Sequence, residues 1–80
     1  MKFRCDSHSG ALYAGLRDGD IAETIEVGPG AYLDIDYAGY VVGAEFLSLE
    51  EMGEFIQRLG GTLDLPERIE DPEHFRLLPA

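Results

Sequence analysis

The sequence has few positive charges. Its 80 residues include six Lys and Arg against 16 Asp and Glu, for a formal charge of −10 and a pI near 4.3. A surface that binds nucleic acid needs clustered cations against the phosphates, and attachment to an anionic membrane leaflet needs them as well. The composition therefore argues against both kinds of partner.

Cysteine and long apolar runs are also scarce. The single Cys5 cannot form an internal disulfide, which favours a reducing compartment, and we expect it to pack as a small buried hydrophobe. No apolar run approaches the roughly 18 residues of a membrane span. The first four residues lack the apolar core of a signal peptide. These absences predict a cytoplasmic protein.

The composition is otherwise that of one small folded domain. With 45% hydrophobic and 28% charged residues, the chain is too apolar to be intrinsically disordered. Residues 18–57 contain ten acids and no Lys or Arg, whereas the rest of the chain is formally neutral. This central acidity is either a solubility device or an acidic face for a basic partner.

Turn residues divide the first part of the chain into five strands. Asp18-Gly19 is typical of a two-residue hairpin turn. Residues 28–30, Gly-Pro-Gly, predict a three-residue loop, and Ala38-Gly39 predicts a weaker turn. We therefore predict a five-stranded antiparallel β-meander with strands at 3–5, 11–17, 20–27, 31–37 and 40–47.

The three turns also predict which residues face one another. Each register places large apolar side chains on the same side of the sheet, and a wrong register would scramble this pattern. The predicted pairs are Leu16–Ile21, Leu12–Ile25, Ile25–Leu33, Val27–Ala31, Ile35–Val42, Leu33–Ala44 and Ala31–Phe46.

A C-terminal amphipathic helix is predicted over residues 48–59. Ser48 and Glu51 form a capping box, and Gly60-Gly61 supplies the stop. Apolar residues recur at helical spacing, and a helix this short must dock on the sheet to be stable. Its predicted apolar side chains are Leu49, Met52, Phe55, Ile56 and Leu59.

The chain then divides into residues 1–59, the sheet-and-helix domain, and residues 60–80, a short C-terminal extension. Asp71-Pro72-Glu73 is typical of the start of a short helix. We expect the extension to pack on the domain or on a partner subunit. Because so small a domain has a limited core, we expect a homodimer, with the fifth strand pairing across a two-fold axis if its edge is exposed. The apolar residues of the extension are Leu63, Leu65, Ile69, Phe75, Leu77 and Leu78.

The opposite face of the sheet collects tyrosines and acids. It is either the ordinary solvated side of an antiparallel sheet, a partner-binding surface, or a carboxylate site for Ca²⁺ or Mg²⁺. Against the metal site, carboxylates on one face of a sheet point in the same direction and rarely converge on one ion. Thr24 shares this face. The candidate partner-binding residues are Tyr13, Glu26, Tyr32, Asp34, Asp36 and Glu45.

Catalytic signatures are weak. Alternation places Glu23 among core residues, so its carboxylate must be paired, protonated or at the rim. His8 lies beside Asp6 and Ser7, but neighbours in one turn cannot hold the geometry of a catalytic triad. We predict no catalytic residue, no metal ligand and no cofactor, and therefore a protein that is not an enzyme.

The ordered motifs resemble a bacterial and archaeal family, domain of unknown function 2283, over residues 6–47. They are Asp6, Ala11-Leu12-Tyr13, Asp18-Gly19, Glu26-Val27, Asp34 with Asp36, Gly39, Val41-Val42-Gly43, Glu45 and Leu47. The chain departs from the family at Gly10, where an Asp is usual, and at Tyr40, where a basic or polar residue is usual. The resemblance supports the sheet-plus-helix fold. It implies no activity; the toxin-like neighbours of some members imply an antitoxin or regulatory role.

We therefore predict a non-catalytic interaction module, antitoxin-like or regulatory, whose acidic sheet face binds a basic and possibly toxin-like protein. The alternative is a small-molecule or divalent-metal-binding domain that uses the same face. A third reading is a structural, self-assembling subunit.

Overall fold

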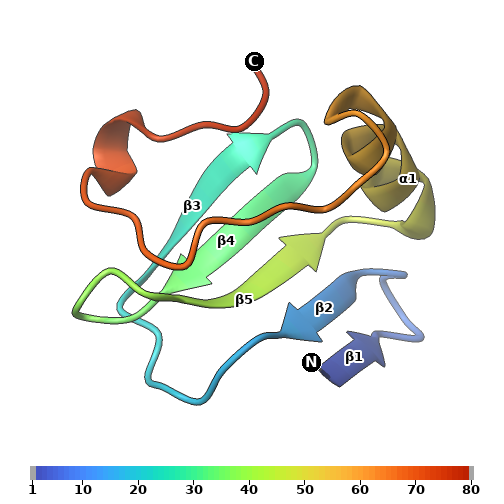
Figure 1. Cartoon of the computed structure of the whole chain (residues 1–80). Helices are drawn as coiled ribbons and strands as arrows, with labels where there is room; N and C mark the ends of the chain where they lie inside the picture. Colours follow the sequence, from blue (N-terminus) through green and yellow to red (C-terminus); the bar gives the residue numbers. More distant parts are fainter. Residues whose placement is uncertain (1, 80) are drawn as a thin grey trace.

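An antiparallel sheet of five strands carries one helix on one of its faces in the computed structural model, which describes residues 2–79 (Figure 1). This confirms the predicted α+β class. The elements are β1 (Lys2–Cys5), β2 (Leu12–Gly15), β3 (Glu23–Gly28), β4 (Ala31–Ile35), β5 (Val41–Phe46), α1 (Leu49–Arg58) and a 3₁₀ turn at Pro72–His74.

The strand order is β1-β2-β5-β4-β3, so the predicted meander is wrong at one connection. β2 lies beside β5, where Leu12 is opposite Phe46. The backbone N–H groups of Leu16 and Arg17 then both donate to the carbonyl of Val42, at 2.9 and 3.3 Å. From there, residues 16–22 run past the ends of β5 and β4 to the far edge of the sheet (Figure 1).

The backbone angles also show that the Asp18-Gly19 hairpin is absent. A type I′ turn needs positive φ at both central residues, and no non-glycine residue in the described part of the chain has positive φ. The predicted pairs Leu12–Ile25 and Leu16–Ile21 are therefore wrong. Side-chain alternation could not reveal this, because Leu12 reaches the same face beside either neighbour.

The other two hairpins have the predicted partners with local shifts of one residue. A bulge near Ile35 places it opposite Val41 instead of Val42, and a second irregularity places Gly28, not Val27, opposite Ala31. Bulges of this kind accommodate one extra residue and bend the strand. The pairs Ile25–Leu33, Leu33–Ala44 and Ala31–Phe46 are confirmed.

Helix α1 begins and ends at the predicted signals. The Ser48 hydroxyl accepts a hydrogen bond from the Glu51 N–H at 3.1 Å, and Gly60 follows the helix with φ +100°. Phe55 is buried against Phe46, with ring centroids 5.6 Å apart. Leu49 is 67% exposed, so it does not belong to the apolar face as predicted: it is the first helical residue and points away from the sheet.

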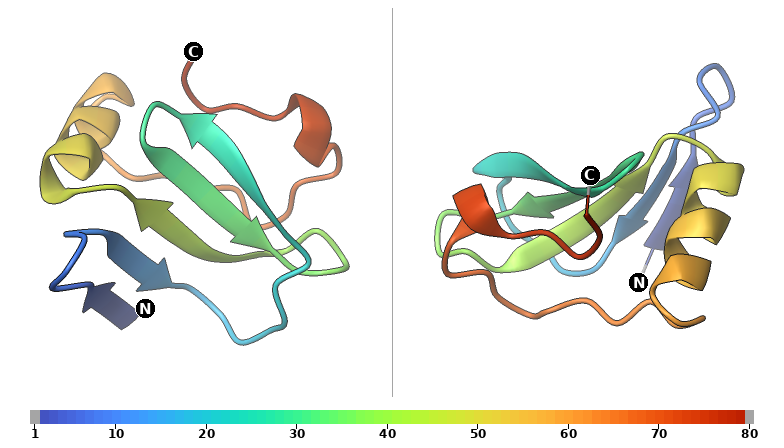
Figure 2. Two further views of the ribbon diagram at one scale, coloured as in Figure 1. Left: turned by 180° about the vertical axis from the view of Figure 1, so that it is seen from behind. Right: turned by 90° about the horizontal axis from the view of Figure 1, so that it is seen from above.

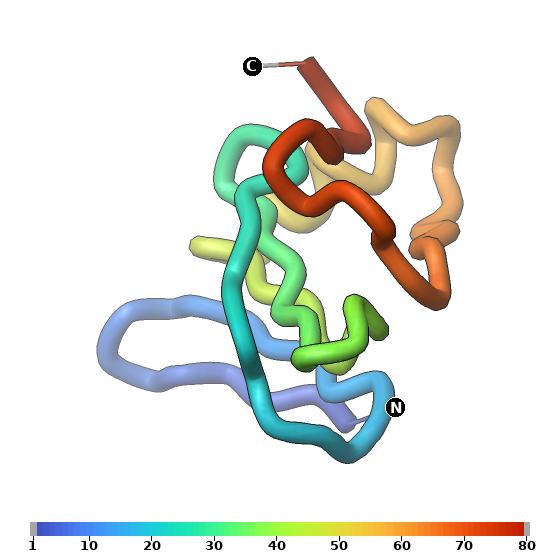
Figure 3. Tube along the Cα trace, turned by 90° about the vertical axis from the view of Figure 1, so that its left-hand side faces the viewer, coloured from blue at the N-terminus to red at the C-terminus, as the bar shows by residue number. Residues whose placement is uncertain are grey.

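The C-terminal segment (residues 60–79) returns along the same side of the sheet as the helix (Figures 2 and 3). The Ile69 N–H donates to the carbonyl of Gly39 at 2.8 Å, and the Leu78 N–H donates to that of Val27 at 3.0 Å. Both Ile69 and Leu78 are buried in the core. The short helix expected after Asp71 is a single 3₁₀ turn.

The edges of the sheet are β1 and β3, whereas β5 is central. The fifth strand therefore has no free edge for pairing across a two-fold axis. Glu23 begins edge strand β3 and is exposed, which is the rim position considered for it. Cys5 is also exposed rather than buried, because β1 lies at the edge that α1 does not cover. Within residues 2–79, no helix is long and apolar enough to cross a membrane.

Two glycines test the packing between the sheet and the second layer. A methyl group added at Gly28 would meet Phe55 ring carbons at 2.7 and 3.0 Å, whereas one added at Gly53 would meet nothing within 4 Å. We predict that Gly28→Ala lowers the free energy of unfolding by about 1–3 kcal/mol. The matched change Gly53→Ala raises it by about 0.5–1 kcal/mol, because alanine favours helix. Urea denaturation measures both, and equal stability of the two variants would contradict the packing described.

Candidate binding site on the outer face

The outer face of the sheet, opposite α1, carries a row of alternating tyrosines and acids. Tyr13 on β2 is opposite Glu45 on β5, and Glu45 is opposite Tyr32 on β4. Tyr32 is in turn opposite Glu26 on β3. The predicted residues thus share one face, although they are brought together through the β2–β5 pairing.

A missing side chain at Gly43 shapes the middle of this face. Gly43 lies opposite Asp34 on one side and Gly15 on the other. A Cβ at Gly43 would collide with the hydroxyl and adjacent ring carbons of Tyr13. Glycine is required here for the close approach of the Tyr13 ring to the backbone of β5.

Asp34 is the buried polar residue of the site. Only 2% of its surface is exposed, which is unexpected for the solvated side of a sheet. The Thr24 hydroxyl donates a hydrogen bond to Asp34 Oδ1 at 2.5 Å. A buried carboxylate is costly unless hydrogen bonds compensate it, so Thr24 has a specific structural role in the site.

Two neighbouring groups have perturbed acidities. Burial raises the pKa of the Glu45 carboxyl above its usual value, and the hydrogen bond and negative charge of Asp34 raise it further. Burial also raises the pKa of the Tyr13 hydroxyl, and the charge of Asp34 adds to this effect. Both shifts mean that the ionised forms of Glu45 and Tyr13 are less favourable beside Asp34 than in water.

These residues line an open pocket of about 570 Å³. Asp34 and Glu45 lie among its lining residues, together with Tyr13, Thr24 and the apolar side chain of Ile21. The loop between β1 and β2 projects on the outer side of the sheet (Figures 2 and 3). Arg4 and Cys5 at the end of β1 and Asp6 at the start of this loop also line the pocket. The Arg4 guanidinium lies 4.9 Å from the centre of the Tyr13 ring.

The other predicted acids have partners of their own. Glu26 forms a salt bridge of 3.1 Å with Arg76 from the C-terminal segment. Asp36 accepts hydrogen bonds from the N–H groups of Ala38 and Tyr40, each at 2.9 Å, so it closes the turn between β4 and β5. The site proper is therefore Tyr13, Asp34 and Glu45, with Tyr32 beside them.

Arg4, Ile21 and Arg76 contribute to this face but were missed by sequence reasoning. Alternation along β1 pairs Arg4 with Tyr13, so its side chain was recoverable from the period-two pattern. Ile21 was assigned to the core by the wrong hairpin. Nothing local in the sequence signals that Arg76 reaches Glu26, because the two residues are 50 positions apart.

The loop at residues 6–10 has a simpler structure. The His8 N–H donates to Asp6 Oδ1 at 2.8 Å, and backbone hydrogen bonds from His8 and Ser9 lower the pKa of the Asp6 carboxyl. Across residues 2–79, no group of three or more His, Cys, Asp or Glu side chains is arranged to hold a metal ion.

One comparison identifies the family. A family model described as "Protein of unknown function (DUF2283)" matches residues 2–49, more than half of the chain. The chain therefore belongs to this family. The match covers all five strands and ends where α1 begins. No curated protein and no solved structure matches the chain.

The raised pKa of Glu45 generates a prediction about stability. A carboxyl whose pKa is raised by folding contributes stability that is present below its ordinary value of 4.5 and is lost as the pH rises through the folded-state value. Glu45→Gln has no ionisable group at this position, so it does not lose this stability as the pH rises. We predict that the change in the free energy of unfolding caused by Glu45→Gln is about 0.5 kcal/mol more favourable at pH 7 than at pH 4.

Denaturation of both proteins at pH 4 and pH 7 measures this difference. Glu54→Gln is the matched control, because it removes the same charge from the exposed surface of α1. The same pH-dependent gain in both variants would show that net charge, rather than the contact with Asp34, is responsible.

Proposed function

We propose that the protein is a non-catalytic interaction module, antitoxin-like or regulatory, whose outer-face pocket binds a cationic side chain of a basic protein. The observation that carries this proposal is the position of Asp34, a buried carboxylate within a pocket that opens to solvent beside Glu45. Lys or Arg is the protein group whose charge matches such a site.

The electrostatics of the pocket favour a cation over a neutral group. Glu45 resists ionisation because of burial and because of Asp34. A guanidinium or ammonium group placed between the two carboxyls offsets their repulsion and favours the ionised form of Glu45. Binding is therefore expected to strengthen as the pH rises through the raised pKa of Glu45.

The aromatic surroundings suit the same ligand. The Tyr13 ring already has one guanidinium, that of Arg4, 4.9 Å from its centre, and Tyr32 adjoins Glu45. Cations stack favourably on such rings, and tyrosine is enriched at protein interfaces. Because Glu26 and Asp36 are engaged within the chain, we expect recognition at the pocket rather than over a uniformly acidic face.

The proposal is tested by capture of a partner from a lysate of the producing cells, with the purified chain as bait. We expect a basic protein that is retained at low salt and released as ionic strength rises. Glu45→Gln should weaken retention at least about tenfold, since hydrogen-bonded charge pairs contribute on the order of 1.5–3 kcal/mol.

Glu54→Gln again serves as the matched control, because it removes one negative charge from α1 and leaves the pocket intact. It should leave retention unchanged. Recovery of no basic protein, retention insensitive to salt, or equal weakening by both variants would each contradict binding at the pocket.

A further inference from the structure

An apolar groove lies on the other side of the sheet, where the second layer is incomplete. Helix α1 packs chiefly against β4 and β5, and the C-terminal segment crosses the same half of the sheet, so neither lies in front of β1 and β2 (Figure 1). The groove has a volume of about 790 Å³. Its apolar lining residues are Phe3, Leu16, Val41, Met52, Ile56, Leu63, Leu65 and Pro66.

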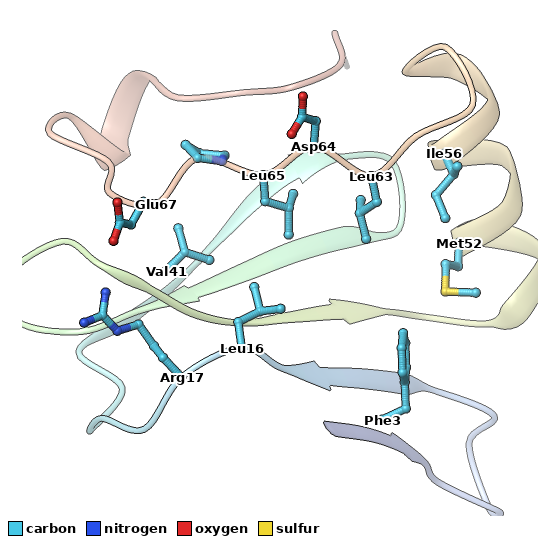
Figure 4. A pocket seen from close by; sticks show the side chains of 11 residues that line it. Phe3, Leu16, Arg17, Val41, Met52, Ile56, Leu63, Asp64, Leu65 and Glu67 are labelled. Carbon is cyan, nitrogen blue, oxygen red and sulfur yellow. The ribbon is translucent and has the colours of Figure 1, made fainter. Parts of the chain in front are cut away.

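The groove has the form of a step. Phe3 and Leu16 lie on the side of β1 and β2, whereas Met52, Ile56 and Leu63 form the facing wall (Figure 4). Phe3 is 59% exposed, which leaves a large aromatic side chain at the open side of an apolar surface. Exposed apolar surface of this kind marks an interaction site.

The two sides of the step carry opposite charge. Residues 1–17 contain three of the six cations and a single acid, and Arg17 lines the groove from this side. Asp64 and Glu67 line it from the C-terminal segment. The C-terminal segment of one molecule is therefore complementary in charge to the β1–β2 side of another.

We propose that this groove is the interface of a homodimer, in which the α1 wall of each copy covers the β1–β2 half of the other. A two-fold axis makes each contact twice, so Arg17 of each copy faces Glu67 of its partner while Phe3 enters the apolar wall. This proposal concerns the opposite side of the sheet from the outer-face pocket and does not depend on its function.

A face-to-face contact fits the observations better than pairing of the β1 edges. Lys2 and Arg4 alternate with Phe3 along that edge, and two antiparallel copies would bring these like charges together. A standard interface buries about 800 Å² per partner, which is about 15% of the 5281 Å² surface of this chain. A contact of that size extends beyond the groove over the surrounding surface of β1, β2 and the C-terminal segment.

The mass of the full-length chain in solution tests the proposal. At about 100 μM, light scattering coupled to size-exclusion chromatography should give about 17.6 kDa, twice the chain mass of 8.8 kDa. Phe3→Asp should give the monomer mass, because it places a charge in the apolar contact. Phe3 is largely exposed, so the variant should retain the far-ultraviolet circular dichroism of the wild type.

Tyr37→Asp is the matched control: Tyr37 is an aromatic residue 86% exposed in the β4–β5 turn, outside the groove, and its variant should remain dimeric. Glu45→Gln should also remain dimeric, which separates this interface from the outer-face pocket. A monomeric wild type, or a Phe3→Asp variant that is still dimeric, would overturn the proposal.

A charge exchange tests the orientation of the two copies. Arg17→Glu and Glu67→Arg should each raise the dimer dissociation constant at least about tenfold, because each puts like charges in contact. The double variant should restore the wild-type dissociation constant. If Arg17→Glu acted only by removing the contact between the Arg17 guanidinium and the Tyr40 ring, 4.3 Å to the ring centre, the second substitution would not restore it. Failure of the double variant to recover would overturn the reciprocal arrangement.

Discussion

The pairing of β2 with β5 is the constraint on which the rest of the structure depends. It makes β5 the central strand, sends residues 16–22 past the strand ends to the far edge, and leaves β1 and β3 as the edges. It also brings Tyr13 beside Glu45 and lays its ring over Gly43. With β2 beside β3, the same residues would still share a face, but Tyr13 would not lie over Gly43, the residue opposite Asp34.

The outer face differs from an ordinary solvated sheet because one of its carboxylates is buried. Asp34 gains a hydrogen bond from Thr24, and it adds to the effect of burial in raising the pKa of the Glu45 carboxyl. A folded chain tolerates a buried charge when it is compensated in this way. Asp34 and Glu45 both line the same pocket, so the proposed cationic side chain would have a defined position on an otherwise broadly acidic protein.

The two faces of the sheet have different relations to the family. The outer-face pocket is formed entirely within residues 2–49, the part matched by the family model. The wall of the apolar groove belongs to α1 and the C-terminal segment, which follow the match. The C-terminal segment completes the core through Ile69 and Leu78, and it leaves Phe3 on β1 largely exposed.

The sequence by itself determined the local features. Alternation placed Tyr13 and Glu45 on one face, and Ser48 with Gly60 bounded the helix, because these signals depend on neighbours a few residues away. Only the tertiary structure decided which strands are neighbours, that Asp34 is buried, and that Arg76 reaches Glu26. A period-two pattern specifies the face of a side chain but not the strand beside it, and that choice is made by the packing of the whole chain.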